Sequence, residues 1–87
     1  SQNFPNPFNP ETSIRYTLPY ATAVRLVIYN SSGQLVRTLV DGAQSMGVHS
    51  VSWNGETDSG VRAASGIYFY KLQAGSFDQI RRMVFLR

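Results

Sequence analysis

One stretch decides the fold of this chain, Gly66-Ile67-Tyr68-Phe69-Tyr70-Lys71-Leu72-Gln73-Ala74. Its residues Tyr68, Tyr70 and Leu72 would share one face of an extended chain, since side chains alternate along a strand. This period of two predicts a β-strand over residues 67–74. The Gly75-Ser76 pair that follows favours a turn.

The same pattern recurs on both sides of this stretch. Further strands are predicted at residues 13–18, 23–29, 34–41, 48–53, 61–63 and 79–86. Asn30-Ser31-Ser32-Gly33 supplies the residues that a tight hairpin turn requires. No window carries apolar residues at helical spacing for long enough to form a helix. We therefore expect an all-β fold, an antiparallel β-sandwich of about seven strands.

Two aromatic residues sharpen this prediction. Gly66-x-Tyr68, at the start of a late strand, is similar to the tyrosine corner of Greek-key sandwiches, in which the hydroxyl bonds back to the preceding loop. The lone Trp53 is expected to anchor the core between the sheets. The predicted core comprises Trp53, Val51, Leu26, Ile28, Tyr68 and Leu72.

Length and composition limit the remaining options. The 87 residues are 43% apolar and 15% charged, which fits one small folded domain and excludes a disordered tail. The absence of cysteine and the single histidine exclude zinc sites of the Cys/His kind. No apolar run approaches membrane-spanning length, so no membrane insertion is expected. No signal peptide is visible and the chain begins at Ser1, so we expect a piece of a longer protein.

The net charge of +3 does not indicate a nucleic-acid partner. Most of the eight Lys and Arg residues stand alone within alternating segments, as on a solvated sheet face. Arg81, Arg82 and Arg87 form the one cluster, and no nucleic-acid-reading module accompanies it. No nucleic acid is therefore expected among the partners.

The first eleven residues differ from the rest. Phe4-Pro5-Asn6-Pro7-Phe8-Asn9-Pro10 must be extended or turned, because each proline removes a backbone donor and restricts the residue before it. It cannot be a central strand. Residues 1–11 are interpreted as a stiff lead-in that lies against the sandwich through Phe4 and Phe8, or alternatively as a proline-rich linker.

Catalytic chemistry has little support in the sequence. His49 and its neighbour Ser50 would point to opposite faces of a strand, so a structural role is expected for the histidine. Asp41, Glu56 and Asp58 lie in turn-like segments of a domain too small to build a deep cleft. We expect no enzyme activity and no cofactor. Calcium in the 54–60 loop is left open, since turn chemistry explains the same oxygen-bearing residues.

Aromatic residues, at 13% of the chain, keep a binding module in consideration. Carbohydrate-binding sandwiches stack sugar rings on exposed aromatic side chains. The residues that alternate out of the predicted core are Tyr20, Tyr29, Phe69 and Phe77. Ordinary sheet packing explains the same residues, because aromatics are favoured in strands.

A longer series of motifs spans nearly the whole chain. The motifs are Phe4-Pro5-Asn6-Pro7-Phe8-Asn9-Pro10, Thr12-x-Ile14-x-Tyr16-x-Leu18-Pro19, Val24-x-Leu26-x-Ile28-Tyr29-Asn30, Gly33-Gln34-Leu35-Val36, Gly47-x-His49-x-Val51-x-Trp53-Asn54-Gly55, Ser65-Gly66-Ile67-Tyr68-Phe69-Tyr70-x-Leu72 and Arg82-Met83-Val84. In this order they resemble the type A C-terminal sorting domain of the type IX (Por) secretion system. They resemble equally the related immunoglobulin-like domain of the flagellar hook-cap protein.

The resemblance implies a delivery module rather than an enzyme. Residues 1–87 would be a single C-terminal sorting domain of immunoglobulin-like fold that directs an N-terminal cargo domain through an outer-membrane translocon. The expected partners are components of the translocon and of a surface peptidase, and the expected location is the cell surface or medium, reached through the periplasm. We expect a monomer. Arg82 stands where a lysine is commoner in the family, which keeps the charge but changes the hydrogen-bond geometry.

The last strand is the predicted partner-binding element. A terminal strand is expected at a sheet edge, where its free backbone groups can accept a partner strand. The predicted partner-binding residues are Arg82, Met83, Val84, Phe85, Leu86 and Arg87. Two alternatives stay open: Met83 and Phe85 simply fill the core, or the domain is a carbohydrate-binding or spacer accessory of a secreted polysaccharide hydrolase.

Overall fold

The computed structural model describes residues 11–86, and six β-strands account for most of them. The strands are β1 (Thr12–Leu18), β2 (Thr22–Asn30), β3 (Leu35–Gln44), β4 (Gly47–Trp53), β5 (Gly66–Ala74) and β6 (Phe77–Phe85). Over residues 11–86 there is no helix with the length and apolar character needed to cross a membrane. The predicted lead-in lies outside the described residues except for Glu11, and so does Arg87.

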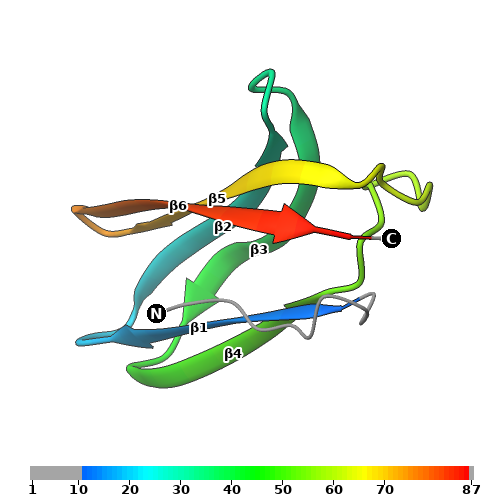
Figure 1. Cartoon of the computed structure of the whole chain (residues 1–87). Helices are drawn as coiled ribbons and strands as arrows, with labels where there is room; N and C mark the ends of the chain where they lie inside the picture. Colours follow the sequence, from blue (N-terminus) through cyan, green and yellow to red (C-terminus); the bar gives the residue numbers. More distant parts are fainter. Residues whose placement is uncertain (1–10, 87) are drawn as a thin grey trace.

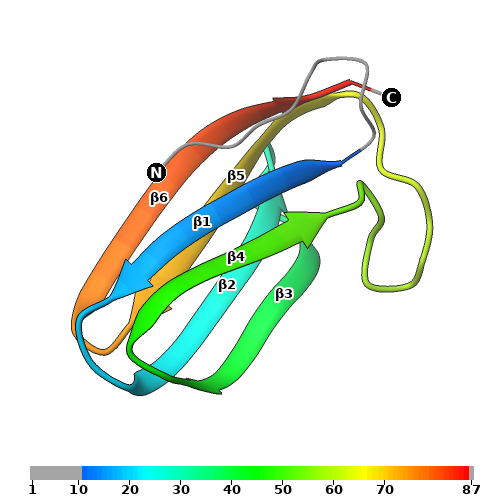
Figure 2. The ribbon, with the colours of Figure 1, turned by 90° about the horizontal axis from the view of Figure 1, so that it is seen from below.

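The strands form two antiparallel sheets that pack face to face as an immunoglobulin-like sandwich (Figures 1 and 2). β1 pairs with β4 in the smaller sheet, and the larger sheet has the order β3-β2-β5-β6. Every second residue of β5, from Tyr68 to Ala74, is buried, which is the period that the sequence predicts. The predicted all-β sandwich is confirmed.

The described residues contain six strands rather than about seven. The predicted extended piece at 61–63 makes only one isolated bridge, between Glu56 and Arg62. β3 continues beyond the predicted end at residue 41 to Gln44, and Asp41 and Gly42 stay in the ladder opposite Arg25 and Val24. The register of this pair shifts between Leu26 and Val27 and between Ile28 and Tyr29, and opposite charges face each other at Arg25 and Asp41.

The core lies between the two sheets and contains most of the residues predicted for it. Trp53, Leu26 and Ile28 are completely buried, and Tyr68 and Leu72 are nearly so. The sequence pattern placed Val51 fully in the core, and this is wrong. Val51 is half-buried and packs against the side of the cluster. β4 lies at the edge of a two-stranded sheet, so its side chains have fewer neighbours to cover them.

The end of the sandwich that contains Trp53 is closed by three aromatic rings. The ring centroid of Trp53 lies 5.3 Å from that of Tyr68 and 5.1 Å from that of Phe85. The Trp53 indole Nε1 donates to the Glu56 carbonyl at 2.9 Å, and the Tyr68 hydroxyl donates to the Ala64 carbonyl at 2.6 Å. The predicted tyrosine corner is therefore present, and residues 54–65 are fastened near both ends.

Candidate functional site

The last strand lies at one edge of the four-stranded sheet, where β5 is its only neighbour among residues 11–86. Met83 and Phe85 point inward and are buried. Arg82, Val84 and Leu86 are exposed. The described members of the predicted partner-binding set are thus divided: Met83 and Phe85 hold the strand to the core, and Arg82, Val84 and Leu86 face solvent.

The exposed side chains of β6 belong to a larger surface on the outer face of the sheet. Arg82 lies opposite Phe69, which in turn lies opposite Tyr29 on β2. Val84 lies opposite Ile67, and both are exposed, at 52% and 42%. We call this surface the outer face; its residues are Val27, Tyr29, Ile67, Phe69, Lys71, Ile80, Arg82 and Val84.

The outer face places cationic side chains next to exposed aliphatic ones, which is unusual for a solvated sheet. Lys71 lies between Val27 and Ile80 in the ladder, so cationic and aliphatic side chains alternate across the strands. Ile80 is 64% exposed, whereas Val27 is 1% exposed although it points away from the core. A clustered apolar surface with cations among it is typical of an interaction surface rather than of plain solvated sheet.

The opposite edge of this sheet is covered by the chain itself. The backbone N–H of Asp58 donates to the Val36 carbonyl of β3 at 2.9 Å. The backbone N–H of Thr38 donates to the Asp58 carboxylate at 3.0 Å, and the Arg37 guanidinium lies 3.8 Å from that carboxylate. The loop therefore supplies both a donor and an acceptor to the β3 edge.

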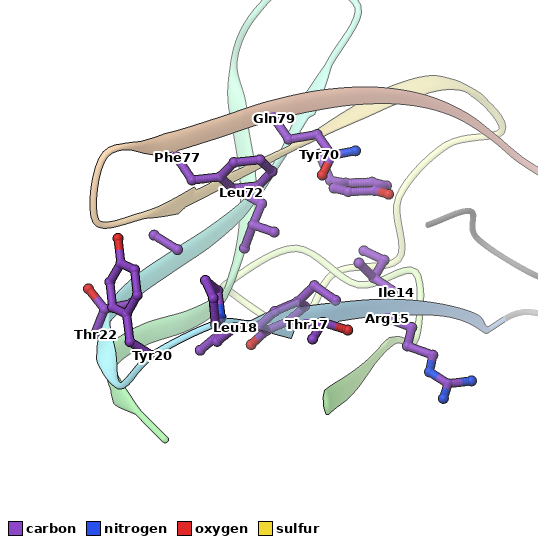
Figure 3. A pocket seen from close by; sticks show the side chains of 13 residues that line it. Ile14, Arg15, Thr17, Leu18, Tyr20, Thr22, Tyr70, Leu72, Phe77 and Gln79 are labelled. Carbon is purple, nitrogen blue, oxygen red and sulfur yellow. The ribbon is translucent and has the colours of Figure 1, made fainter. Parts of the chain in front are cut away.

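A groove of about 610 Å³ opens between β1 and the start of β6 (Figure 3). Its floor is formed by the inner face of β5, at Tyr70 and Leu72. Tyr20 and Phe77 stand at the end where the chain turns into β2 and β6. The described residues leave a groove at this end of the sandwich, whereas Trp53 and its neighbouring rings fill the other end.

The four aromatic residues considered for sugar binding fall into two separate places. Tyr29 and Phe69 are cross-strand neighbours on the outer face. Tyr20 and Phe77 line the groove instead. The four rings thus do not form one stacking platform.

The residues considered for catalysis and metal binding have structural partners. The His49 ring stacks on Tyr16 at 5.4 Å, and its Nε2 donates to the Ser45 carbonyl at 2.8 Å. Tyr16 donates to the Gln44 side chain; burial raises the pKa of Tyr16 above its ordinary value, although this bond acts the other way. Within residues 11–86 no three His, Cys, Asp or Glu side chains gather as a metal site would require.

The loop considered for calcium uses its oxygens within the protein. The Asn54 side-chain oxygen accepts from the backbone N–H of Glu56 at 3.1 Å. The Asp58 carboxylate accepts from Thr38, as described above. The first bond is turn chemistry, the alternative that the sequence left open, and the second fastens the loop to β3.

Comparison with protein families identifies the chain. The model of the FlgD Ig-like domain family matches residues 9–78. The chain belongs to this family. The resemblance inferred from the sequence motifs is therefore confirmed at the level of the family. No curated protein matches the chain in sequence.

Two solved structures share the fold of this FlgD Ig-like domain. FlgD from P. aeruginosa superposes with a TM-score of 0.66 at 23% identity, covering 85% of this chain and 58% of that one. Dimeric latent PorU from Porphyromonas gingivalis superposes with a TM-score of 0.76 at 20% identity, covering 98% of this chain and 9% of that one. The chain thus corresponds to a part of each of these longer proteins.

Sequence reasoning selected β6 but missed its neighbours on the outer face. Tyr29 and Phe69 were considered only for sugar stacking, and Lys71 was assigned to no site. The alternation in residues 67–72 already placed Ile67, Phe69 and Lys71 on one face. The missing information was the strand order, which sets β6 next to β5 and β5 next to β2.

Proposed function

We propose that this domain is a non-catalytic sorting module that directs a larger cargo protein through the type IX machinery to the cell surface or medium. Membership of the FlgD Ig-like family and the fold shared with PorU support a module of this kind. The partners under this proposal are translocon and surface-peptidase components, with the cargo joined at the N-terminal side. The domain acts as a monomer.

One observation carries the proposal, namely how β6 is held. Met83 and Phe85 are buried, so the strand is fixed to the core, while Arg82, Val84 and Leu86 remain exposed on an edge strand. An edge strand of this kind offers backbone groups and a row of side chains to a partner. The arginine side chain adds donors suited to an acidic partner group.

The experiment is a reporter fused to residues 1–87 and expressed in a host with a type IX translocon. We expect the reporter outside the cell, and an unfused reporter in the periplasm. Retention of the full fusion in the periplasm would rule out the sorting role.

A second arm asks whether β6 is the part that is recognised. Deletion of residues 83–87 is a poor probe, because it removes Met83 and Phe85 from the core. Val84→Glu keeps both core residues, and Ser52→Glu on exposed β4 is its matched control. Export that is lost for Val84→Glu but kept for Ser52→Glu supports recognition of β6. Equal export of both variants would mean that the machinery recognises another part of the domain.

A further inference from the structure

β6 lacks the features that usually keep an edge strand from pairing with another chain. It is the outermost strand of its sheet (Figure 2), and β5 is the one strand among residues 11–86 that pairs with it. It is nine residues long, contains no proline and pairs with β5 without a shift in register. Short length, prolines and bulges are common means of protecting an edge. β6 can therefore pair with a further strand along most of its length.

The backbone groups that β6 offers to such a strand belong to every second residue. Ala74 and Phe77 flank a two-residue turn, and in such a hairpin the flanking residues exchange hydrogen bonds. The N–H and C=O groups of Phe77, and of every second residue after it, thus face β5. Those of Asp78, Ile80 and Arg82 face away from β5. The side chains of these three residues are exposed on the side of the outer face.

Two opposite charges on this side of β6 have no partner within one copy of the chain. Asp78 is the only acidic residue of β6, and Arg82 follows four residues later. An extended strand separates them by about 13 Å, which is too far for an ion pair. Among residues 11–86 neither side chain forms an ion pair with any other residue. A second strand that runs antiparallel can bring an opposite charge to each.

We propose that β6 pairs antiparallel with β6 of a second copy of this chain, around a twofold axis at Ile80. In this register Asp78 faces Arg82 of the second copy, and the symmetry repeats the pair. The two Ile80 side chains, each 64% exposed in one copy, face each other at the axis. The proposal goes beyond the sorting role and does not depend on it. The monomer remains the form proposed for export, because self-pairing covers the β6 edge.

The inner side of β6 fits the same register. Phe77, which is 53% exposed, lies opposite Met83 of the second copy and gains an apolar neighbour. Gln79 lies opposite Arg81 of the second copy. Within one copy the Gln79 and Arg81 side chains already lie within hydrogen-bonding distance of each other. An amide thus meets a guanidinium across the axis as it does along the strand.

Neighbouring registers do not give these contacts. With the axis at Arg81, two Arg81 side chains face each other and Asp78 faces Val84. With the axis at Arg82, two Arg82 side chains face each other. With the axis one residue before Ile80, Asp78 faces Ile80 and its charge stays unpaired. Like charges directly opposite each other are destabilising, so charge complementarity selects the axis at Ile80.

Exchange of the two charges tests this register in residues 1–87. Asp78→Arg and Arg82→Asp each place two pairs of like charges across the axis. We expect each variant to dimerise at least about tenfold more weakly than the unchanged chain in analytical ultracentrifugation over a dilution series. A mixture of the two variants restores opposite charges in both pairs and should restore dimers, which also shows that both variants are folded. Arg15→Asp on exposed β1 is the control and should leave dimerisation unchanged.

A disulfide locates the axis independently of charge. The chain contains no cysteine, so Ile80→Cys introduces a single thiol. Facing residues of a hydrogen-bonded antiparallel pair have Cα atoms about 5.5 Å apart, which a disulfide can span. Val84→Cys on the same side of β6 is the control, because the two Val84 positions lie about 26 Å apart in this register. We expect Ile80→Cys to form linked dimers at least about tenfold faster than Val84→Cys.

Three results would overturn the proposal. The first is a chain that stays monomeric throughout the dilution series. The second is a dimer that neither charge variant weakens, because its contact would then lie elsewhere. The third is equal oxidation of the two cysteine variants, since β6 would then have no fixed register with β6 of the second copy.

Discussion

The two edges of the four-stranded sheet are treated in opposite ways. At the β3 edge, Asp58 bonds to Val36 and Thr38, so the loop completes the ladder as another strand would. At the β6 edge no described residue does this, and Val84 and Ile80 remain exposed beside it. Proteins usually protect their sheet edges against pairing with other chains. Under the proposed function, the β3 edge is protected for stability and the β6 edge is kept accessible to a partner.

The largest loss of stability is expected from a substitution that affects both the core and the loop that protects the β3 edge. Trp53→Ala should lower the free energy of unfolding by about 3–5 kcal/mol, because it opens a cavity between the sheets and removes the bond that holds Glu56. Urea unfolding followed by far-ultraviolet circular dichroism measures this loss. A variant as stable as the unchanged domain would contradict the assigned core.

A smaller loss is expected when the other fastening of the loop is removed. Tyr68→Phe deletes only the hydroxyl that bonds to Ala64, which should cost about 1–2 kcal/mol. Tyr29→Phe on the outer face serves as control for loss of an aromatic hydroxyl. Equal unfolding midpoints for Tyr68→Phe and the unchanged domain would show that the corner bond contributes nothing.

Part of the protection of the β3 edge can be removed by a surface substitution that leaves the backbone bond of Asp58 to Val36 in place. Asp58→Ala deletes the acceptor of the Thr38 N–H, and we expect a loss of about 1 kcal/mol because the edge donor can then bond to water. Amide exchange at Thr38 should become faster, while exchange in β5 should follow only the change in global stability. Unchanged exchange at Thr38 would mean that the loop does not protect this edge.

The smallest expected change in stability belongs to the accessible edge. Ala74 and Phe77 flank a two-residue turn, so the backbone N–H groups of Asp78, Ile80, Arg82 and Val84 should face away from β5. Val84→Pro removes one of these edge donors and should cost under about 1 kcal/mol, as prolines are tolerated on the open side of edge strands.

Export then separates two ways of recognising β6. If a partner adds a strand to this edge, Val84→Pro should abolish export of a fused reporter and Val84→Ala should not. Equal export of the two variants would exclude strand addition at Val84 and leave recognition by side chains.

The sequence predicted where the strands lie along the chain better than it predicted which strands pair with each other. Alternation from Tyr68 to Ala74 predicted β5 and its buried face, because period two reports directly which side chains are covered. The corner bond of Tyr68 and the burial of Trp53 followed from local motifs. The sequence placed Asp41 in a turn-like segment and ended the strand there, whereas Asp41 and Gly42 pair with Arg25 and Val24 of β2.

The site was predicted in part for the same reason. The division of Met83 and Phe85 from Arg82 and Val84 is a local alternation, and the sequence contains it. The outer face and the groove depend on strand order and on how far the smaller sheet extends over the larger one. Neither quantity is encoded within a single strand, and so neither was predicted.

The most direct test compares two double substitutions that introduce negative charge on exposed edge strands. Arg82→Glu with Val84→Glu alters the outer face of β6, and Arg15→Glu with Thr17→Glu makes the same kind of change on β1. Both pairs replace exposed residues two apart, so similar unfolding midpoints are expected. In a host with a type IX translocon, the account predicts that a reporter fused to the β6 variant stays in the periplasm while the β1 variant is exported. Equal export of two folded variants would contradict the claim that β6 is the surface the machinery recognises.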